Sequence, residues 1–431
     1  MNHNLQRFES LLLNEHYFRV LHSSGLPVYV FPKQMVTTHA LFAVRYGAVN
    51  NVPDEKGKKP FPDGIAHFLE HKLFSNEDGS DSFERFSAYG ADANAYTSHS
   101  STVYLFTATD RFEDSFGELI DFVTHPYFTK ETVKKEQGII AEEIRMCRDN
   151  PYDRCYYNML GGLYHKNPVR EEICGSIRSI SQITANSLYD CYHRYYVPEN
   201  MAIVVCGDLT VEQVMRIVDA HLPPEFKGKA PKTVLPDEPR TVCKASVKDY
   251  GQVARPIFSI GVKDVAIPAD PLERVKHEIA LSVLMEMIFS ESGELYNSLL
   301  DRQLVAPDFA AELAISDQFG FMQISGEADD PEEILQEIQA HLQTLRQTGL
   351  SERDFERVKK VELSEWIKGF DSTEAVAGVL LSFAFKGLDM FSYTDLLQNL
   401  HFEDVKTLFE TFFDPDLFVL SVVHPIKQKN K

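Results

Sequence analysis

The chain repeats itself along its length, and this limits its fold more than any other feature of the sequence. Three stretches of the first half recur in the second half with similar apolar patterns and nearly constant spacing. The paired stretches are 65–75 with 280–290, 128–136 with 350–358, and 188–208 with 405–425. A recurrence of this kind signals repeated units of structure. The sequence therefore predicts two halves of like fold.

The order of apolar patterns within a half predicts an α+β fold. In the first half the strand-like segments 26–32 and 39–47 come before an apolar helix at 65–75. Two further strand-like segments follow at 93–98 and 102–109, and then long helices and a closing strand. Runs of strands and then of helices, without strict alternation, are typical of helices layered on a largely antiparallel sheet.

A proline-rich stretch near the midpoint predicts the boundary between the halves. Residues 222–240 hold five prolines and alternating charges, with neither a helical nor a strand period. Such a segment is typical of an extended linker. We expect an N-terminal domain over 1–221, a linker over 222–244, and a C-terminal domain over 245–431.

Composition and charge exclude several classes of function. The formal net charge of −21 argues against nucleic-acid binding, which depends on clustered Lys and Arg. The sequence has no apolar run of about 18 residues that would span a bilayer, and its first residues do not resemble a secretion signal. Its six cysteines form no C-x-x-C pair and are expected to be reduced, mostly buried thiols. We expect a cytoplasmic protein with no membrane partner.

The apolar helix of the first half carries an unusual polar group, His67, Glu70 and His71. Residues four apart lie on one helix face about 5–6 Å from each other, so two imidazoles can reach one metal ion. Glu70 is turned by about 100° from His71 and can approach a water molecule on the metal without being a ligand. A pair of helix histidines is more often a structural feature, and the short pattern alone produces false positives.

A zinc ion at this pair needs a third protein ligand, because zinc bound by three side chains keeps one position open for water. The best source is the acidic helix near residues 134–151, where Glu136 and Glu143 lie two turns apart on one face and Glu142 lies beside them. Any of these carboxylates can instead belong to a solvated helix face, and for Glu142 that interpretation is preferred. The second half has the apolar helix without the histidines.

H-x-x-E-H is the inverted zincin motif. With "GIAHFLEHKLF", "GADANAYTS", "EEIRMCRDNP" and "ITANSLYDCYHRYYVPENMAIVVCGDL", the chain resembles the pitrilysin/insulinase family of zinc metallopeptidases over nearly its whole length. It is most similar to the two-domain, processing-peptidase-like bacterial form. The resemblance implies two homologous α/β-sandwich halves that face a central chamber, and peptides or unstructured segments as substrates.

The resemblance also implies a role for each residue of the site. One Zn²⁺ per chain would be bound by His67, His71 and Glu143, with Glu70 as the general base and Glu136 as a second acidic residue that supports the site. A peptide substrate would lie along an exposed strand that carries Asn94, Ala95, Tyr96 and Thr97. Judged without the resemblance, Asn94 would be a turn residue that enters a strand.

One part of the family pattern is altered. Active members carry an arginine and, seven residues later, a tyrosine that hold the substrate and the oxyanion. Here Arg302 is followed by Phe309, which has no hydrogen-bond donor. The resemblance thus implies a dimer, either with a related subunit that lacks the zinc motif and completes the site, or as a homodimer in which Arg302 suffices together with another donor. A surface role for Arg302 also stays open.

Two other functions compete with a zinc peptidase. The chain could be a non-catalytic, chaperone-like binding subunit that keeps the chamber fold, although a complete His67, Glu70, His71 and Glu143 set argues against this. It could also be a metal-dependent hydrolase of non-peptide substrates. The strand-like segment at Asn94–Thr97 disfavours that function, because it suits an extended peptide backbone.

Overall fold

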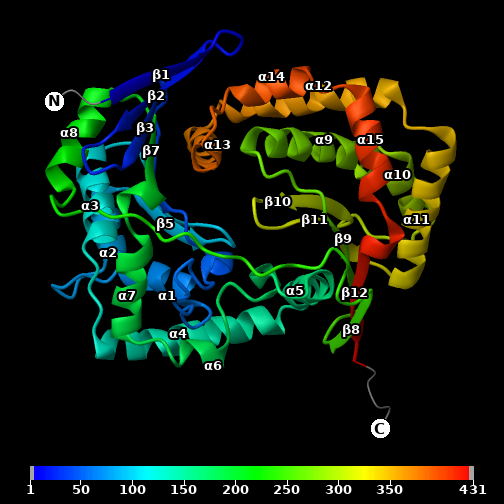
Figure 1. The fold of residues 1–431 in the computed structure, drawn as a ribbon, viewed down its shortest axis with the longest axis horizontal. Coiled ribbons are helices and arrows are strands. Elements are labelled where there is room, and N and C mark those ends of the chain that lie inside the picture. The colour runs from blue at the N-terminus through cyan, green and yellow to red at the C-terminus, as the bar shows by residue number, and fades with distance from the viewer. Residues whose placement is uncertain (1–3, 427–431) are drawn as a thin grey trace. The chain divides into compact units, whose positions relative to one another are not determined.

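The computed structural model describes residues 4–426 and divides into two compact units, each built around one β-sheet (Figure 1). Unit 1 comprises the chain up to Ile144 together with Glu172–Val234 and Glu365–Ser392. Unit 2 comprises Arg145–Glu171, Leu235–Ser364 and the chain from Tyr393 onward. Within residues 4–426 no helix is both long enough and apolar enough to cross a membrane.

The sheet of unit 1 has seven strands in the order β1-β2-β3-β7-β4-β6-β5. Every neighbouring pair is antiparallel except β3 and β7, which run parallel. The strands are β1 Asn4–Ser10, β2 Glu15–Leu21, β3 Pro27–Pro32, β4 Thr38–Val44, β5 Asp92–Thr97, β6 Thr102–Ala108 and β7 Met201–Gly207.

The sheet of unit 2 repeats this topology. Its order is β8-β12-β9-β11-β10, with one parallel pair, β8 and β12, followed by three antiparallel pairs. This is the pattern of β3-β7-β4-β6-β5, so β1 and β2 are additions to the first sheet. The strands are β8 Ser246–Gly251, β9 Ile257–Lys263, β10 Ala310–Ile315, β11 Gly320–Glu327 and β12 Phe418–Pro425. The predicted α+β fold of two like, largely antiparallel halves is confirmed.

Helices follow the strands in the same order in both halves of the sequence. The first half has α1 Ile65–Leu73, α2 Ser82–Tyr89, α3 Phe112–Thr124, α4 Lys130–Asp149, α5 Pro151–Leu163, α6 Ile177–Ile180, α7 Ala185–Tyr195 and α8 Val211–His221. The second half has α9 Pro271–Phe289, α10 Glu294–Asp301, α11 Pro331–Thr348, α12 Glu352–Gly369, α13 Thr373–Lys386, α14 Ser392–Gln398 and α15 Phe402–Phe412.

One helix from each half of the sequence packs on the sheet of the other half. Helix α13 packs against β4 and β7 within unit 1, whereas α5 packs against β12, β9 and β8 within unit 2. The exchange explains why the compact units are not the contiguous stretches 1–221 and 245–431. Those stretches stay a prediction about the duplicated parts of the sequence.

The main core of unit 1 lies on the face of its sheet that carries α1 and α3. Alternate residues of β3 and β4, such as Val30 and Phe42, point into this core. Helix α1 contributes Ile65, Phe68 and Leu69 to the same cluster. Because the apolar side chains of α1 are buried on one side, packing in the core determines the rotation of the helix about its axis. The same rotation determines where the polar residues of α1 point.

The predicted linker segment contains no helix or named strand, and it is tied down at several points. In unit 1 the amide of Val234 donates to the carbonyl of Pro53 at 3.0 Å. In unit 2 the carboxylate of Glu238 accepts three backbone amides, from His165, Lys166 and Asn167. It also pairs with the buried Lys263 at 2.8 Å. Charge-assisted bonds of this kind order a segment that lacks helix and strand.

Candidate metal centre

The start of α1 is positioned by a close backbone contact. Gly64 precedes the helix with φ of 89°, in the left-handed region that glycine favours. A Cβ atom at Gly64 would lie 2.4 Å from the carbonyl oxygen of Cys174, and one at Gly175 would lie 2.5 Å from that of Asp63. Two glycines therefore allow the chain before α1 to touch the segment before α6, and the motif helix begins at that contact.

The side chains of His67, His71 and Glu143 converge between α1 and α4. One ligand atom from each lies within 4.8 Å of the others. His67 Nε2 is 3.4 Å from one oxygen of Glu143, and His71 Nε2 is 3.5 Å from the other oxygen. Two imidazole nitrogens and a carboxylate oxygen at these separations form a donor set that suits zinc. The sequence left three carboxylates open, and the structure brings Glu143 to the histidines.

The remaining nitrogen of each imidazole has a different environment. His71 Nδ1 lies 3.1 Å from Glu136 Oε1, so that Nε2 is turned toward Glu143. Such a carboxylate partner fixes the orientation of a metal-binding histidine. His67 Nδ1 is buried and has no hydrogen-bond partner among residues 4–426. Glu136 therefore orients one of the two histidines.

The charges around the histidines shift several pKa values. Burial opposes the charged form of His71, but the hydrogen bond to Glu136 and the charges of Glu70, Glu136 and Glu143 outweigh burial and raise the pKa of His71. The pKa of Glu143 is lowered, chiefly by its hydrogen bond to His67. The pKa of Glu136 is also lowered, because His71 and Lys72 together outweigh the effect of burial. These pKa shifts favour the charged forms of His71, Glu136 and Glu143.

Glu70 lies on the same helix but is held by a residue of strand β5. The hydroxyl of Thr97 donates to Glu70 Oε2 at 2.6 Å. The sequence pattern assigned Thr97 to substrate binding and gave no sign of this bond, because the two residues lie far apart in the chain. The bond orients the carboxylate that was predicted to act as the base.

Strand β5 lies at an edge of the sheet and pairs only with β6 among the described strands. Its residues alternate between the two faces of the sheet. Asn94 and Tyr96 are exposed, whereas Ala93 and Ala95 pack against the core. Asn94 is thus in the middle of the strand and not in a turn. The free edge exposes backbone groups that another extended peptide can pair with.

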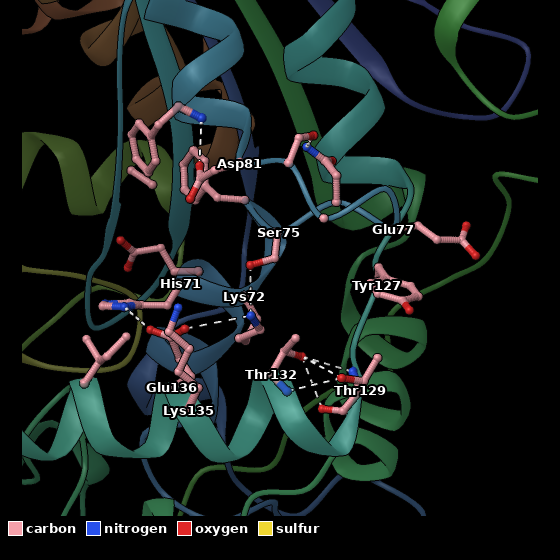
Figure 2. A pocket seen from close by; sticks show the side chains of 18 of the residues that line it. His71, Lys72, Ser75, Glu77, Asp81, Tyr127, Thr129, Thr132, Lys135 and Glu136 are labelled. Atoms are coloured by element: carbon pink, nitrogen blue, oxygen red, sulfur yellow. Dashed lines mark hydrogen bonds and ion pairs between the residues drawn. The ribbon is translucent and has the colours of Figure 1, made fainter.

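A pocket of about 810 Å³ lies beside the candidate metal-binding group, within unit 1. Figure 2 shows its lining from α1, α4 and the loop that follows α1, with Glu136 in contact with both His71 and Lys72. Glu70 and residues 94–95 of β5 also line it. The pocket thus connects the proposed base with the free edge strand.

Lys72 is a site residue that the sequence pattern did not single out. It lies on the apolar side of α1, one turn after Phe68, and only 2% of it is exposed. A lysine at a core position of an amphipathic helix is the sequence signal that could have indicated it. Burial lowers the pKa of Lys72, and the charge of Glu136 partly offsets this effect.

Other predicted residues lie elsewhere. Glu142 is exposed on α4 and is not in the convergent group. Arg302 caps the end of α10 on the surface of unit 2 and forms two bonds of 2.7 Å to Glu337. Phe309 is buried against Phe258 and Tyr296. A phenol in the place of Phe309 would therefore lie in the apolar core of unit 2.

Comparisons with known proteins agree with the geometry. A family model described as "Insulinase (Peptidase family M16)" matches residues 58–176, and one described as "Peptidase M16 inactive domain" matches residues 182–362. A Bacillus subtilis protein named "Uncharacterized zinc protease YmfH" is 34% identical over 424 residues, which are 96% of this chain and 97% of that protein.

Solved structures share the fold. The structure of a putative M16-like peptidase from Alicyclobacillus acidocaldarius is 30% identical, with a TM-score of 0.89 over 99% of both chains. A protease from Helicobacter pylori is 18% identical, with a TM-score of 0.81 over 95% of this chain and 100% of that chain. The second similarity is one of fold alone.

Proposed function

Because this chain belongs to the insulinase family of peptidases, peptidase family M16, we propose that it hydrolyses peptide bonds with one zinc ion held by His67, His71 and Glu143. The observation that carries the proposal is the convergence of these three side chains beside Glu70 and a free edge strand. Zinc bound there would act as a Lewis acid that polarises the scissile carbonyl and acidifies water.

Within this proposal the side chains of the chain have separate tasks. Glu70 accepts the proton of the attacking water and returns it to the leaving amine. Thr97 holds one oxygen of Glu70 by the bond of 2.6 Å, which orients the carboxylate. Glu136 holds His71 by its Nδ1 atom, so that the other ring nitrogen stays directed at the metal position.

We propose that the substrate is a peptide or an unstructured segment that adds a strand to the free edge of β5. Main-chain hydrogen bonds along Asn94–Thr97 would align the peptide, and side chains next to the scissile bond would enter the pocket beside Glu70. The scissile bond must also reach the pocket beside Glu70, so the proposal favours extended chains over folded domains as substrates.

The proposed assembly is a dimer, either of two identical chains or with a related subunit that lacks the zinc motif. The altered Arg302 and Phe309 pair favours the related subunit, because Arg302 is engaged by Glu337 and Phe309 donates no hydrogen bond. Arg302 would have to leave Glu337 to hold a substrate. We retain a cytoplasmic location as a prediction.

The first experiment compares the purified wild type with Glu70→Gln for zinc content and for hydrolysis of a fluorogenic peptide library. Each protein is measured alone and after mixing with a related subunit that lacks the motif. We expect Glu70→Gln to keep its zinc and to lose hydrolysis by about a thousandfold, because a positioned general base contributes about 10²–10⁴-fold. The control is Glu142→Gln, which removes an exposed carboxylate of α4 and should retain both zinc and activity.

Two results would reject the proposal. Full hydrolysis by zinc-loaded Glu70→Gln would exclude Glu70 as the base. A zinc-loaded wild type that cleaves no peptide, alone or in the mixture, would favour the non-catalytic binding subunit. Activity only in the mixture would support both the peptidase and the heterodimer.

A further inference from the structure

Lys72 carries its ammonium group in a buried position beside the candidate metal site. Its side chain is 3% exposed, and its helix neighbours Phe68 and Leu73 are also buried. Removing an ammonium group from water costs several kcal/mol unless charged and polar groups compensate it. The compensating groups indicate what the lysine does.

Within the described part of the chain, Lys72 Nζ has two partners, and one of them leads to the metal-binding group. It donates to Ser75 Oγ at 2.9 Å, and it lies 3.8 Å from Glu136 Oε2. The other oxygen of the same carboxylate, Oε1, is the partner of His71 Nδ1 at 3.1 Å. Figure 2 shows this chain of contacts, which runs from Ser75 through Lys72 and Glu136 to His71. The two oxygens of Glu136 are thus divided between a cation and an imidazole.

Glu136 needs both partners to keep its orientation, because its side chain borders the pocket. Its side chain is 12% exposed and lines the pocket, so it could turn toward the water there. Three carboxylates, Glu70, Glu136 and Glu143, surround the histidines, and a divalent ion would leave one negative charge uncompensated. Lys72 supplies the matching positive charge next to Glu136. Glu136 contacts the Nδ1 atom of His71, whereas the Nε2 atom of the same ring faces Glu143.

We propose that Lys72 is a positioning residue for the metal site, which holds Glu136 in the orientation that fixes His71 for metal binding. The inference rests on the proposed function only in requiring that His67, His71 and Glu143 bind zinc. Without Lys72, the carboxylate of Glu136 loses the partner of its second oxygen and turns toward the pocket. His71 then loses the acceptor at Nδ1, and its ring is free to rotate.

Charge alone predicts the opposite effect, and this makes the proposal easy to test. Removing a positive charge close to a cation site strengthens cation binding, because a repulsion is lost. Removing a positioning residue weakens it, since partners of a metal-binding histidine typically contribute 10–100-fold to metal affinity. The sign of the change in zinc affinity therefore separates positioning from simple repulsion.

The test measures the dissociation constant of zinc by competition with a chelator for Lys72→Met, Glu136→Gln and the double variant. Methionine keeps the approximate length of the lysine chain in its buried position. We expect Lys72→Met to weaken zinc binding about tenfold. We expect no further weakening when Lys72→Met is added to Glu136→Gln, because the lysine acts through that carboxylate.

The matched control is Lys135→Met, which removes an exposed lysine that lines the same pocket and has no ion pair with Glu136 among residues 4–426. Loss of this charge should leave zinc binding unchanged or slightly strengthen it. The unfolding temperature of each metal-free variant is measured as well, so that a general loss of stability is recognised. A metal-free Lys72→Met protein that is as stable as the wild type and binds zinc weakly supports the proposal.

Three results would overturn the inference. The first is unchanged or tighter zinc binding by Lys72→Met. The second is that Lys72→Met weakens zinc binding by the same factor in the Glu136→Gln background. The third is that Lys135→Met weakens zinc binding as much as Lys72→Met does. A wild type that does not bind zinc at all would instead reject the proposed function, so the two failures are distinguishable.

Discussion

At the scale of single residues, the proposed active site depends on side chains that hold other side chains. Glu136 orients His71, and Thr97 orients Glu70. A motif of five residues brings the groups close together, but their directions depend on these partners from α4 and β5. Hydrogen bonds to a charged group contribute about 1.5–3 kcal/mol, which is enough to select one side-chain orientation.

Thr97→Val should lower kcat about tenfold and leave KM nearly unchanged, because valine has the shape of threonine but cannot donate to Glu70. A tenfold lower kcat corresponds to a rise of about 1.4 kcal/mol in the activation free energy. Thr97→Ser retains the hydroxyl and should behave like the wild type. The measurement is steady-state hydrolysis of one peptide at equal zinc content. A higher KM with an unchanged kcat would mean that Thr97 serves only in peptide binding.

At the scale of elements, α1 is held by its apolar face and by the backbone contact at its start. Ile65, Phe68 and Leu69 anchor the helix in the core of unit 1. Gly64 and Gly175 let two chain segments approach more closely than any other residue type allows. The position of the motif helix along its own axis therefore depends on a contact between residues far apart in the sequence.

Gly64→Ala should destabilise the protein by about 3 kcal/mol, since a left-handed backbone costs about 1–2 kcal/mol for alanine and the clash with Cys174 adds a similar amount. The matched control is Gly79→Ala. Gly79 has a similar φ of 82°, but a Cβ atom at this position would have nothing within 4 Å. Its substitution should cost only about 1 kcal/mol. Urea unfolding of both variants measures the difference, and equal losses would show that the contact is unimportant.

At the scale of the whole molecule, the exchange of α5 and α13 makes the two halves of the sequence depend on each other. Tyr29, Phe31 and Leu41 point away from the α1 face of their sheet, and all three are buried in the intact protein. Leu41 lies on β4, which α13 contacts within unit 1, and the ring of Phe31 packs on Phe370 and Phe391, which flank α13 in the sequence. In the same way α5 buries Met159 and Leu163 against residues of β9 in unit 2. Each contiguous half therefore lacks one helix of its own sheet.

We expect the fragment 1–221 to fail to fold when it is produced alone, because an apolar sheet face would be exposed to water. The control is co-expression of 1–230 with 231–431, which supplies every helix and interrupts only the extended linker. Near-UV circular dichroism and the soluble yield compare the two preparations. Cooperative unfolding of the isolated fragment 1–221 would contradict the expected interdependence.

Local patterns in the sequence sufficed for the duplicated fold, the inverted motif and the acidic helix, because apolar periodicity and residue spacing act over a few turns of chain. They also sufficed for the family, which rests on several motifs along the chain. The choice of Glu143 over Glu142 depended on how α4 faces α1, which spacing alone left open. The roles of Thr97 and Lys72 and the exchange of α5 and α13 depend on contacts between segments that are distant in sequence. Such contacts exist only after the core has packed, and only the tertiary structure decided them.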